Sequence, residues 1–105
     1  MRALFVTVLA STAALAAPDV SHAKVVVVRG SADHMEQVLQ HAKVDFVAVS
    51  PADLPELALN AKQVLMVNCT GDMSPQARER VRRFVAAGGF LYTTDHAVHQ
   101  LIEPI

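Results

Sequence analysis

The sequence predicts an α/β domain with three layers, in which helices flank a mostly parallel sheet of four strands. Two observations lead to this prediction: short apolar runs recur along the chain, and the segments between them carry the signals that start and stop helices. The runs are apolar throughout rather than alternating, which is typical of strands covered on both faces of a parallel sheet. Strands that alternate with helices also favour parallel neighbours joined by right-handed crossovers.

The first strand and the helix after it are expected directly behind a leader segment. Residues 24–28 are mostly valine, and a turn at 29–31 ends the run. We expect Asp33 to cap the next helix, with Glu36 three residues later completing a capping box. The helix should end at residues 42–43. Its apolar stripe at helical spacing consists of Met35, Val38, Leu39 and Ala42.

Two further strands are expected in the middle of the chain. Residues 44–49 predict the second strand, which ends at 50–51 in a Ser-Pro pair. The connector after it is rich in helix-stopping proline, and we expect a helical turn or two within 55–61. Residues 64–68 predict the third strand, which ends in a turn at 69–72.

The next helix has the clearest boundaries in the chain. Ser74 is a favourable N-cap, and Pro75 suits the first helical position. Glu79 and Arg83 are spaced to pair at i, i+4, and the glycines at 88–89 predict a left-handed stop. The expected buried face consists of Ala77, Val81, Phe84, Val85 and Gly88.

The last expected elements are a fourth strand at 90–94 and a helix at 97–102, just before Pro104. Four parallel strands with so little chain after them would leave strand edges and one face of the sheet poorly covered. We therefore expect the front part of a longer domain or, alternatively, a small domain completed by dimerisation. A protein partner or a second copy of the chain is the partner that this implies.

The first residues have the three-part pattern of a secretory signal peptide. A positively charged start precedes an apolar stretch at 3–17, and small residues mark cleavage points after Ala16 or Ala23. The apolar stretch is shorter than the ~20 residues that a spanning helix needs. We expect a signal peptide at 1–23, a mature domain at 24–105, a periplasmic or secreted location, and no stable membrane insertion after cleavage.

The composition argues against several classes of protein. The net charge of −1 provides no field that would attract nucleic acid. A single cysteine, Cys69, excludes an internal disulfide. Neither GxGxxG nor GxxxxGK[ST] is present, and we expect no cofactor. The cluster of arginines on the expected helix is interpreted as a solvated face, with an anionic partner as the alternative; it consists of Arg78, Arg80, Arg82 and Arg83.

The predicted site lies where the strands end. In open parallel sheets ligands bind beyond the carboxyl ends of the strands, and those ends share one edge. Ligand contacts are therefore expected from the ends of the third and fourth strands. The candidates are Asn68, Thr70, Gly71, Thr94 and Asp95.

The candidates for catalysis are Asp95, His96 and Cys69. Asp95 is interpreted as the N-cap of the following helix, with a ligand-contacting role as the alternative. His96 and His99 have the i, i+3 spacing of a metal pair, but no CxxC or HExxH motif supplies further ligands, so we predict no metal. Cys69 is interpreted as a small, partly buried residue, with a thiol nucleophile that uses His96 as its base as the alternative.

The stretches VLMVNCTG and SPQARERVRRFVAAGGFLYTTDHA resemble the class I glutamine amidotransferase-like superfamily, whose α/β fold is flavodoxin-like. The resemblance covers residues 24–101. In active members a catalytic cysteine occupies the elbow, the sharp turn between the last of these strands and its helix, and the matching position here is Asp95. Cys69 matches an earlier turn that supplies backbone amides. The catalytic histidine and its acidic partner would lie further downstream, in a region that this chain lacks.

The resemblance therefore implies a member of the superfamily without glutamine amidotransferase activity. The function that we expect is that of an exported domain acting as a non-catalytic binding or interaction module. The alternative is a hydrolase that uses Asp95 and His96, with or without a metal, on a small polar or carbohydrate substrate.

Overall fold

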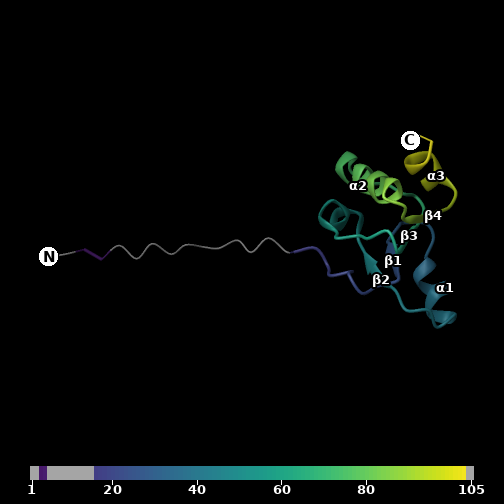
Figure 1. The fold of residues 1–105 in the computed structure, drawn as a ribbon, viewed down its shortest axis with the longest axis horizontal. Helices are drawn as coiled ribbons and strands as arrows, with labels where there is room; N and C mark the ends of the chain where they lie inside the picture. The colour runs from purple at the N-terminus through teal and green to yellow at the C-terminus, as the bar shows by residue number, and fades with distance from the viewer. Residues whose placement is uncertain (1–2, 5–15, 104–105) are drawn as a thin grey trace.

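The computed structural model describes residues 3–4 and 16–103. In this part of the chain, four strands run parallel in one sheet with the order β2-β1-β3-β4, so the predicted parallel sheet is confirmed (Figure 1). The central strand β1 pairs with both β2 and β3, and Val26 lies opposite Val47 on one side and Leu65 on the other. The strands are β1 (Val25–Val28), β2 (Val47–Val49), β3 (Val64–Val67) and β4 (Phe90–Thr93).

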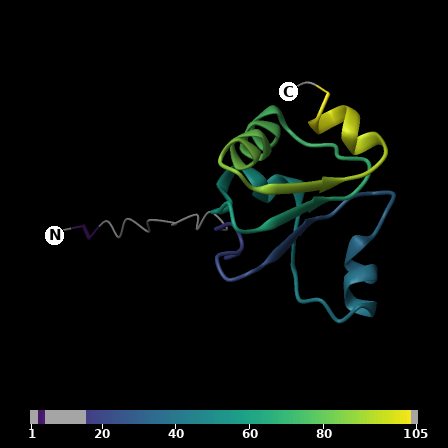
Figure 2. The same cartoon turned by 45° about the vertical axis from the view of Figure 1, so that its right-hand side comes forward.

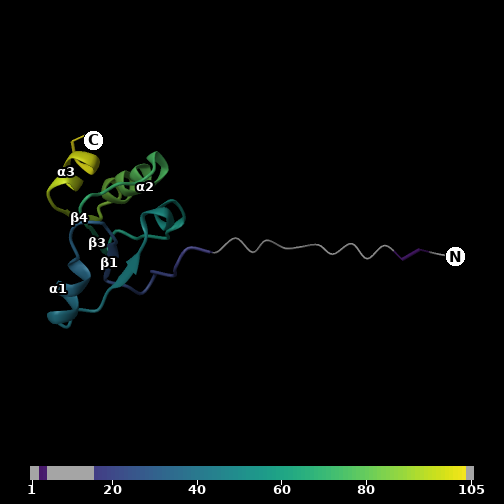
Figure 3. The same cartoon turned by 180° about the vertical axis from the view of Figure 1, so that it is seen from behind.

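Helices cover both faces of the sheet, which gives the three predicted layers. Figure 2 shows α1 on one side of the sheet and α2 with α3 on the other. The short 3-10 helix η1 joins the second group and packs against α2, as the view from behind also shows (Figure 3). The helices are α1 (Met35–His41), η1 (Pro51–Glu56), α2 (Pro75–Ala86) and α3 (His96–Leu101).

The main hydrophobic core lies between the sheet and the group of η1, α2 and α3. Alternate strand residues point to this face, because successive side chains of a strand point to opposite faces. The strands contribute Val26, Val28, Val49, Leu65 and Val67. The helices contribute Leu54, Ala77, Val81, Phe84, Ala97 and Leu101.

The other face of the sheet is thinly covered, as the sequence predicts. Among the described residues α1 lies over it (Figure 2), and Leu39 of α1 and Val27 of β1 are both buried. At the β4 edge, Phe90 is 63% exposed and Tyr92 is 40% exposed. Large apolar side chains therefore remain on the surface of this face.

Helix α1 differs from the prediction at its start. His34 is the N-cap and makes no side-chain capping hydrogen bond, so the expected capping box of Asp33 and Glu36 is wrong. Both carboxylates accept hydrogen bonds from the ends of β3 and β4 instead. The predicted stripe is also only partly buried, since Val38 is 57% exposed.

The second strand and the helical turn in the connector after it also lie at different residues from those predicted. β2 begins at Val47 rather than at residue 44, because its register with β1 starts at Val26 and leaves residues 44–46 without a partner strand. The helical turn expected within 55–61 lies earlier in the chain, where η1 spans Pro51–Glu56. The carboxylate of Asp53 fixes its start, accepting the Ser50 backbone N–H at 2.9 Å.

The boundaries of α2 agree with the prediction. The Ser74 hydroxyl oxygen accepts the Ala77 N–H at 3.1 Å, and the helix ends before Gly88, which has a left-handed φ of 99°. The expected pairing of Glu79 is wrong, however. Its carboxylate binds Arg82, one turn away at i, i+3.

The arginines of α2 do not share one role. Arg80 donates from Nε to the Leu57 carbonyl oxygen at 3.0 Å and from Nη2 to the Leu59 carbonyl oxygen at 3.3 Å. Partial burial lowers the pKa of Arg80, with a smaller contribution from neighbouring Arg83. The interpretation of all the arginines as solvated is therefore wrong for Arg80, which ties the chain after η1 to α2. The expected burial of Val85 is also wrong, since it is 37% exposed.

The segment before β1 is part of the fold. Val20 is 1% exposed and belongs to the main core, and Ala17 and Ala23 pack against that core. Most of the predicted signal peptide falls on residues 1–2 and 5–15, outside the described residues. Among the described residues, no helix combines the length and apolar character needed to cross a membrane.

We expect Val20→Ala to lower the free energy of unfolding by about 2 kcal/mol, because removing buried methyl groups loses their transfer free energy and leaves a cavity. Val38→Ala is the matched control, since its side chain is 57% exposed. Chemical denaturation of both variants measures the difference. Equally small losses in the two would show that Val20 does not contribute to the core.

Candidate functional site

The carboxyl ends of β1, β3 and β4 lie side by side, and one carboxylate connects them. Asp33, in the loop after β1, accepts the backbone N–H of Cys69 through Oδ1 at 2.5 Å. Its Oδ2 accepts the hydroxyl of Thr94 at 2.8 Å. The predicted meeting of the β3 and β4 ends at one edge is therefore present, and Asp33 joins them.

Asn68 is the buried polar residue of this edge, with 1% of its surface exposed. Its Oδ1 accepts the backbone N–H of Met35 at 3.2 Å, and its Nδ2 donates to Glu36 Oε2 at 2.9 Å. The first turn of α1 thus receives from Asn68 the acceptor that an N-cap side chain usually supplies. Asn68, predicted as a ligand contact, is engaged within the protein.

Sequence reasoning missed the roles of Asp33 and Glu36 at this edge. Both follow β1, whose carboxyl end was expected at the shared edge, so their position along the chain was a usable signal. The capping-box spacing offered a purely local explanation for the same two residues. In the structure their partners are distant in sequence and lie just beyond the ends of β3 and β4.

Two glycines allow close approaches around the edge. A Cβ on Gly30 would lie 2.1 Å from the Cys69 carbonyl oxygen, so the chain after β1 can meet the chain after β3 only without a side chain there. Gly71 has a φ of 79°, and a Cβ on it would lie 2.8 Å from Ala97 of α3. The loop after β3 is therefore in close contact with both of its neighbours.

A small hollow of about 200 Å³ opens between these loops. The Thr70 hydroxyl donates to Asp72 Oδ2 at 2.5 Å and lies 3.4 Å from the Ser31 hydroxyl. Hydroxyl groups, a carboxylate and a guanidinium thus surround one space. The lining residues are Arg29, Gly30, Ser31, Pro51, Thr70, Gly71 and Asp72.

Asp95 occupies the turn between β4 and α3 with φ 52° and ψ −125°, a conformation that L-residues rarely adopt. Such a conformation costs about 1–3 kcal/mol and persists only where the surroundings enforce it. Asp95 is at the N-cap, as predicted, but its carboxylate makes no capping hydrogen bond. Its backbone carbonyl accepts the Val98 N–H at 3.0 Å instead. The exposed carboxylate is thus available to a ligand.

The two histidines of α3 have different surroundings. His99 Nδ1 lies 2.7 Å from Glu103 Oε2, and this hydrogen bond raises the pKa of His99. His96 is exposed in the first turn. Within the part of the chain that the structure describes, no three His, Cys, Asp or Glu side chains are grouped so that they could hold a metal ion.

Cys69 is buried at the end of β3, with 4% of its surface exposed. Its backbone is bound on both sides, because the N–H donates to Asp33 and the carbonyl accepts the Ala32 N–H at 3.0 Å. No hydrogen bond joins its thiol to His96 among the described residues.

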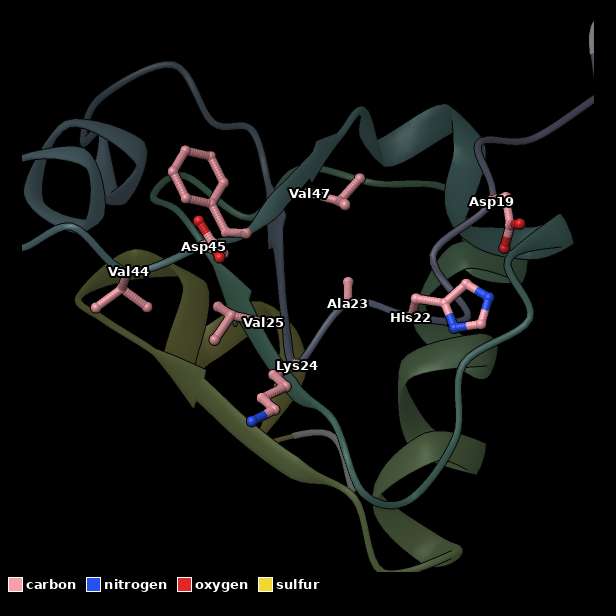
Figure 4. A pocket seen from close by; sticks show the side chains of 9 residues that line it. Asp19, His22, Ala23, Lys24, Val25, Val44, Asp45 and Val47 are labelled. Atoms are coloured by element: carbon pink, nitrogen blue, oxygen red, sulfur yellow. The ribbon is translucent and has the colours of Figure 1, made fainter.

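A larger hollow of about 540 Å³ lies at the opposite end of the sheet. Figure 4 shows Asp19 and His22 on one side of it and Val44 and Asp45 on the other. Val25 forms part of its apolar floor. This hollow was not predicted from the sequence, because it depends on how the segment before β1 lies against the start of β2.

The chain was compared with protein family models, with curated proteins and with solved structures, and none of them matches it. The parallel four-stranded sheet with the order β2-β1-β3-β4 is compatible with a flavodoxin-like fold.

We expect Asp33→Asn to lower the free energy of unfolding by about 1–3 kcal/mol, because one carboxylate oxygen becomes an amide that faces a donor and cannot accept. Asp45→Asn makes the same chemical change at an exposed position and is the control. Thermal and denaturant unfolding measure both. If Asp33→Asn proves as neutral as the control, the carboxylate does not hold the strand ends together.

We expect Asp95→Gly to raise the free energy of unfolding by about 1 kcal/mol, because glycine adopts positive φ without the steric cost. Asp95→Ala keeps that cost and should not stabilise the protein. Thermal unfolding distinguishes them. A loss of stability in both variants would mean that the carboxylate itself holds the turn.

Proposed function

We propose that this protein is an exported domain of the class I glutamine amidotransferase-like superfamily that binds a small polar ligand and does not catalyse glutamine hydrolysis. The sheet order and the sharp β4–α3 turn support the relationship. The aspartate at the elbow supports the absence of amidotransferase chemistry, because an aspartate does not supply the thiol nucleophile of that reaction.

The observation that carries the binding role is the hollow at the carboxyl edge. Its hydrogen-bonding groups come from the chain after β1 and β3, and Pro51, just after β2, also lines it. Ligands in parallel α/β sheets bind at this edge, where several loops converge. By contrast, the candidate reactive groups differ in access, since Cys69 is buried while Asp95 and His96 are exposed at the start of α3.

The lining favours a small ligand without net charge. Arg29 supplies one positive charge and Asp72 one negative charge. The Ser31 hydroxyl can donate and accept, while the Thr70 hydroxyl, which donates its hydrogen to Asp72, can accept. A molecule with several hydroxyl groups, or one with both an ammonium and a carboxylate, satisfies these groups. A volume of about 200 Å³ restricts the ligand to the size of a monosaccharide or an amino acid.

The binding role can be tested by adding glucose and, separately, glycine to the isotope-labelled protein and following its amide resonances. We expect one of them to shift the signals of Ser31, Thr70 and Gly71 in a saturable way. Thr70→Val should abolish the response, because it removes the hydroxyl and keeps the shape. Thr93→Val is the matched control, since the Thr93 hydroxyl is buried without a partner in the described structure.

The absence of any saturable shift with either compound would contradict a site for small neutral solutes. Shifts confined to the distant residues Val25 and Val47 would assign binding to the larger hollow instead. In either case the exported location would be unaffected, because it rests on the leader sequence alone.

A hydrolase remains the second candidate, and the strained elbow favours it. Enzymes with a strand–turn–helix elbow present their nucleophile on such a turn. The Asp95 carboxylate would act as nucleophile or base, with His96 as the proton carrier and with or without a metal. Hydrolysis of a nitrophenyl glycoside that is retained in Thr70→Val but lost in Asp95→Gly, with the fold intact, would support this candidate and contradict the non-catalytic proposal.

A protein partner or a second copy of this chain is also proposed, for the thinly covered face of the sheet. Phe90 and Tyr92 are exposed there beside the edge of β4, which pairs with no further strand among the described residues. Strand edges with apolar neighbours are common places of association.

A further inference from the structure

The residues just before β1 are built into the domain rather than attached to it. Val20 is one of the largest fully buried side chains, and Ala17 and Ala23 pack on the same core. Asp19 holds the start of the segment, with Oδ1 accepting the Ser21 backbone N–H at 2.9 Å and the Ser21 hydroxyl at 2.7 Å. A turn follows, in which the Ala23 N–H donates to the Val20 carbonyl at 3.0 Å.

A buried glutamine fixes this turn to the sheet. Gln63, which is 3% exposed, donates from Nε2 to the Val20 carbonyl at 2.6 Å and to the Ala23 carbonyl at 2.8 Å. Its Oε1 accepts the Asn60 N–H at 2.9 Å. The whole side-chain amide of Gln63 is therefore matched to the segment before β1 and to the loop before β3.

The two candidate cleavage points of the leader differ in which of these contacts cleavage would remove. Cleavage after Ala23 would remove Val20 from the core, expose the apolar surface beneath it, and leave the Gln63 amide without two of its acceptors. Cleavage after Ala16 would leave all of these contacts in place. Ala16 is exposed, and the packed residues begin at Ala17.

We propose that a signal peptidase hydrolyses the bond between Ala16 and Ala17, so that residues 17–23 remain in the mature domain. One water is consumed, the carboxylate forms at Ala16, and the new amine forms at Ala17. Ala14 and Ala16 are the small residues that such a peptidase reads before the bond. The inference rests on the proposed export and moves the start of the mature domain from residue 24 to residue 17.

The test is expression of the full chain in a bacterium, followed by separation of periplasm and cytoplasm and by intact-mass and N-terminal analysis. We expect a periplasmic product that begins at Ala17. Ala14→Phe should cause the precursor to accumulate, because it blocks the third residue before the proposed bond. Ser21→Phe is the matched control, since it blocks the same position for cleavage after Ala23, and its product should still begin at Ala17.

A periplasmic product that begins at Lys24 would overturn the inference while leaving export intact. An unprocessed chain confined to the cytoplasm would overturn both the inference and the export proposal. Normal processing of Ala14→Phe together with a block in Ser21→Phe would likewise overturn the inference.

Discussion

The carboxylate of Asp33 is the interaction on which the geometry of the candidate site depends. One oxygen accepts the backbone N–H of Cys69 just after β3, and the other accepts the Thr94 hydroxyl just after β4. Parallel strands bring their carboxyl ends to one edge, but they do not fix how the loops beyond those ends sit. Asp33 fixes these loops, because a single carboxylate can accept hydrogen bonds from the chain beyond two strands at once.

The fold was predictable because its signals are local. The valine-rich runs at 24–28 and 64–68, the Ser74-Pro75 start of α2 and the left-handed Gly88 each act within a few residues of the chain, and each is found close to where it was expected. Parallel pairing then follows from the alternation of strands and helices. The length of β2 was not predictable in this way, since it depends on its register with β1.

The site was less predictable because its contacts join residues far apart in sequence. Asp33 reaches partners 36 and 61 residues away, while the capping box that it was expected to form spans only a single turn. The burial of Val20 was hard to predict for the same reason. Its neighbours in the chain resemble a leader, and its burial depends on Gln63, 43 residues downstream. A local motif identified these residues but not their partners.

The strained turn at Asp95 shows how the fold and the site depend on each other. Its carboxylate makes no capping hydrogen bond, so the energy that maintains the positive φ must come from elsewhere. Ala97 and Leu101 of α3 are buried in the main core, and Gly71 leaves the space that Ala97 occupies. Burial of α3 therefore holds the turn, because moving α3 to relax it would expose both side chains. Since packing maintains the backbone, the turn does not depend on a capping hydrogen bond from Asp95, which lies exposed at the edge where the strands end.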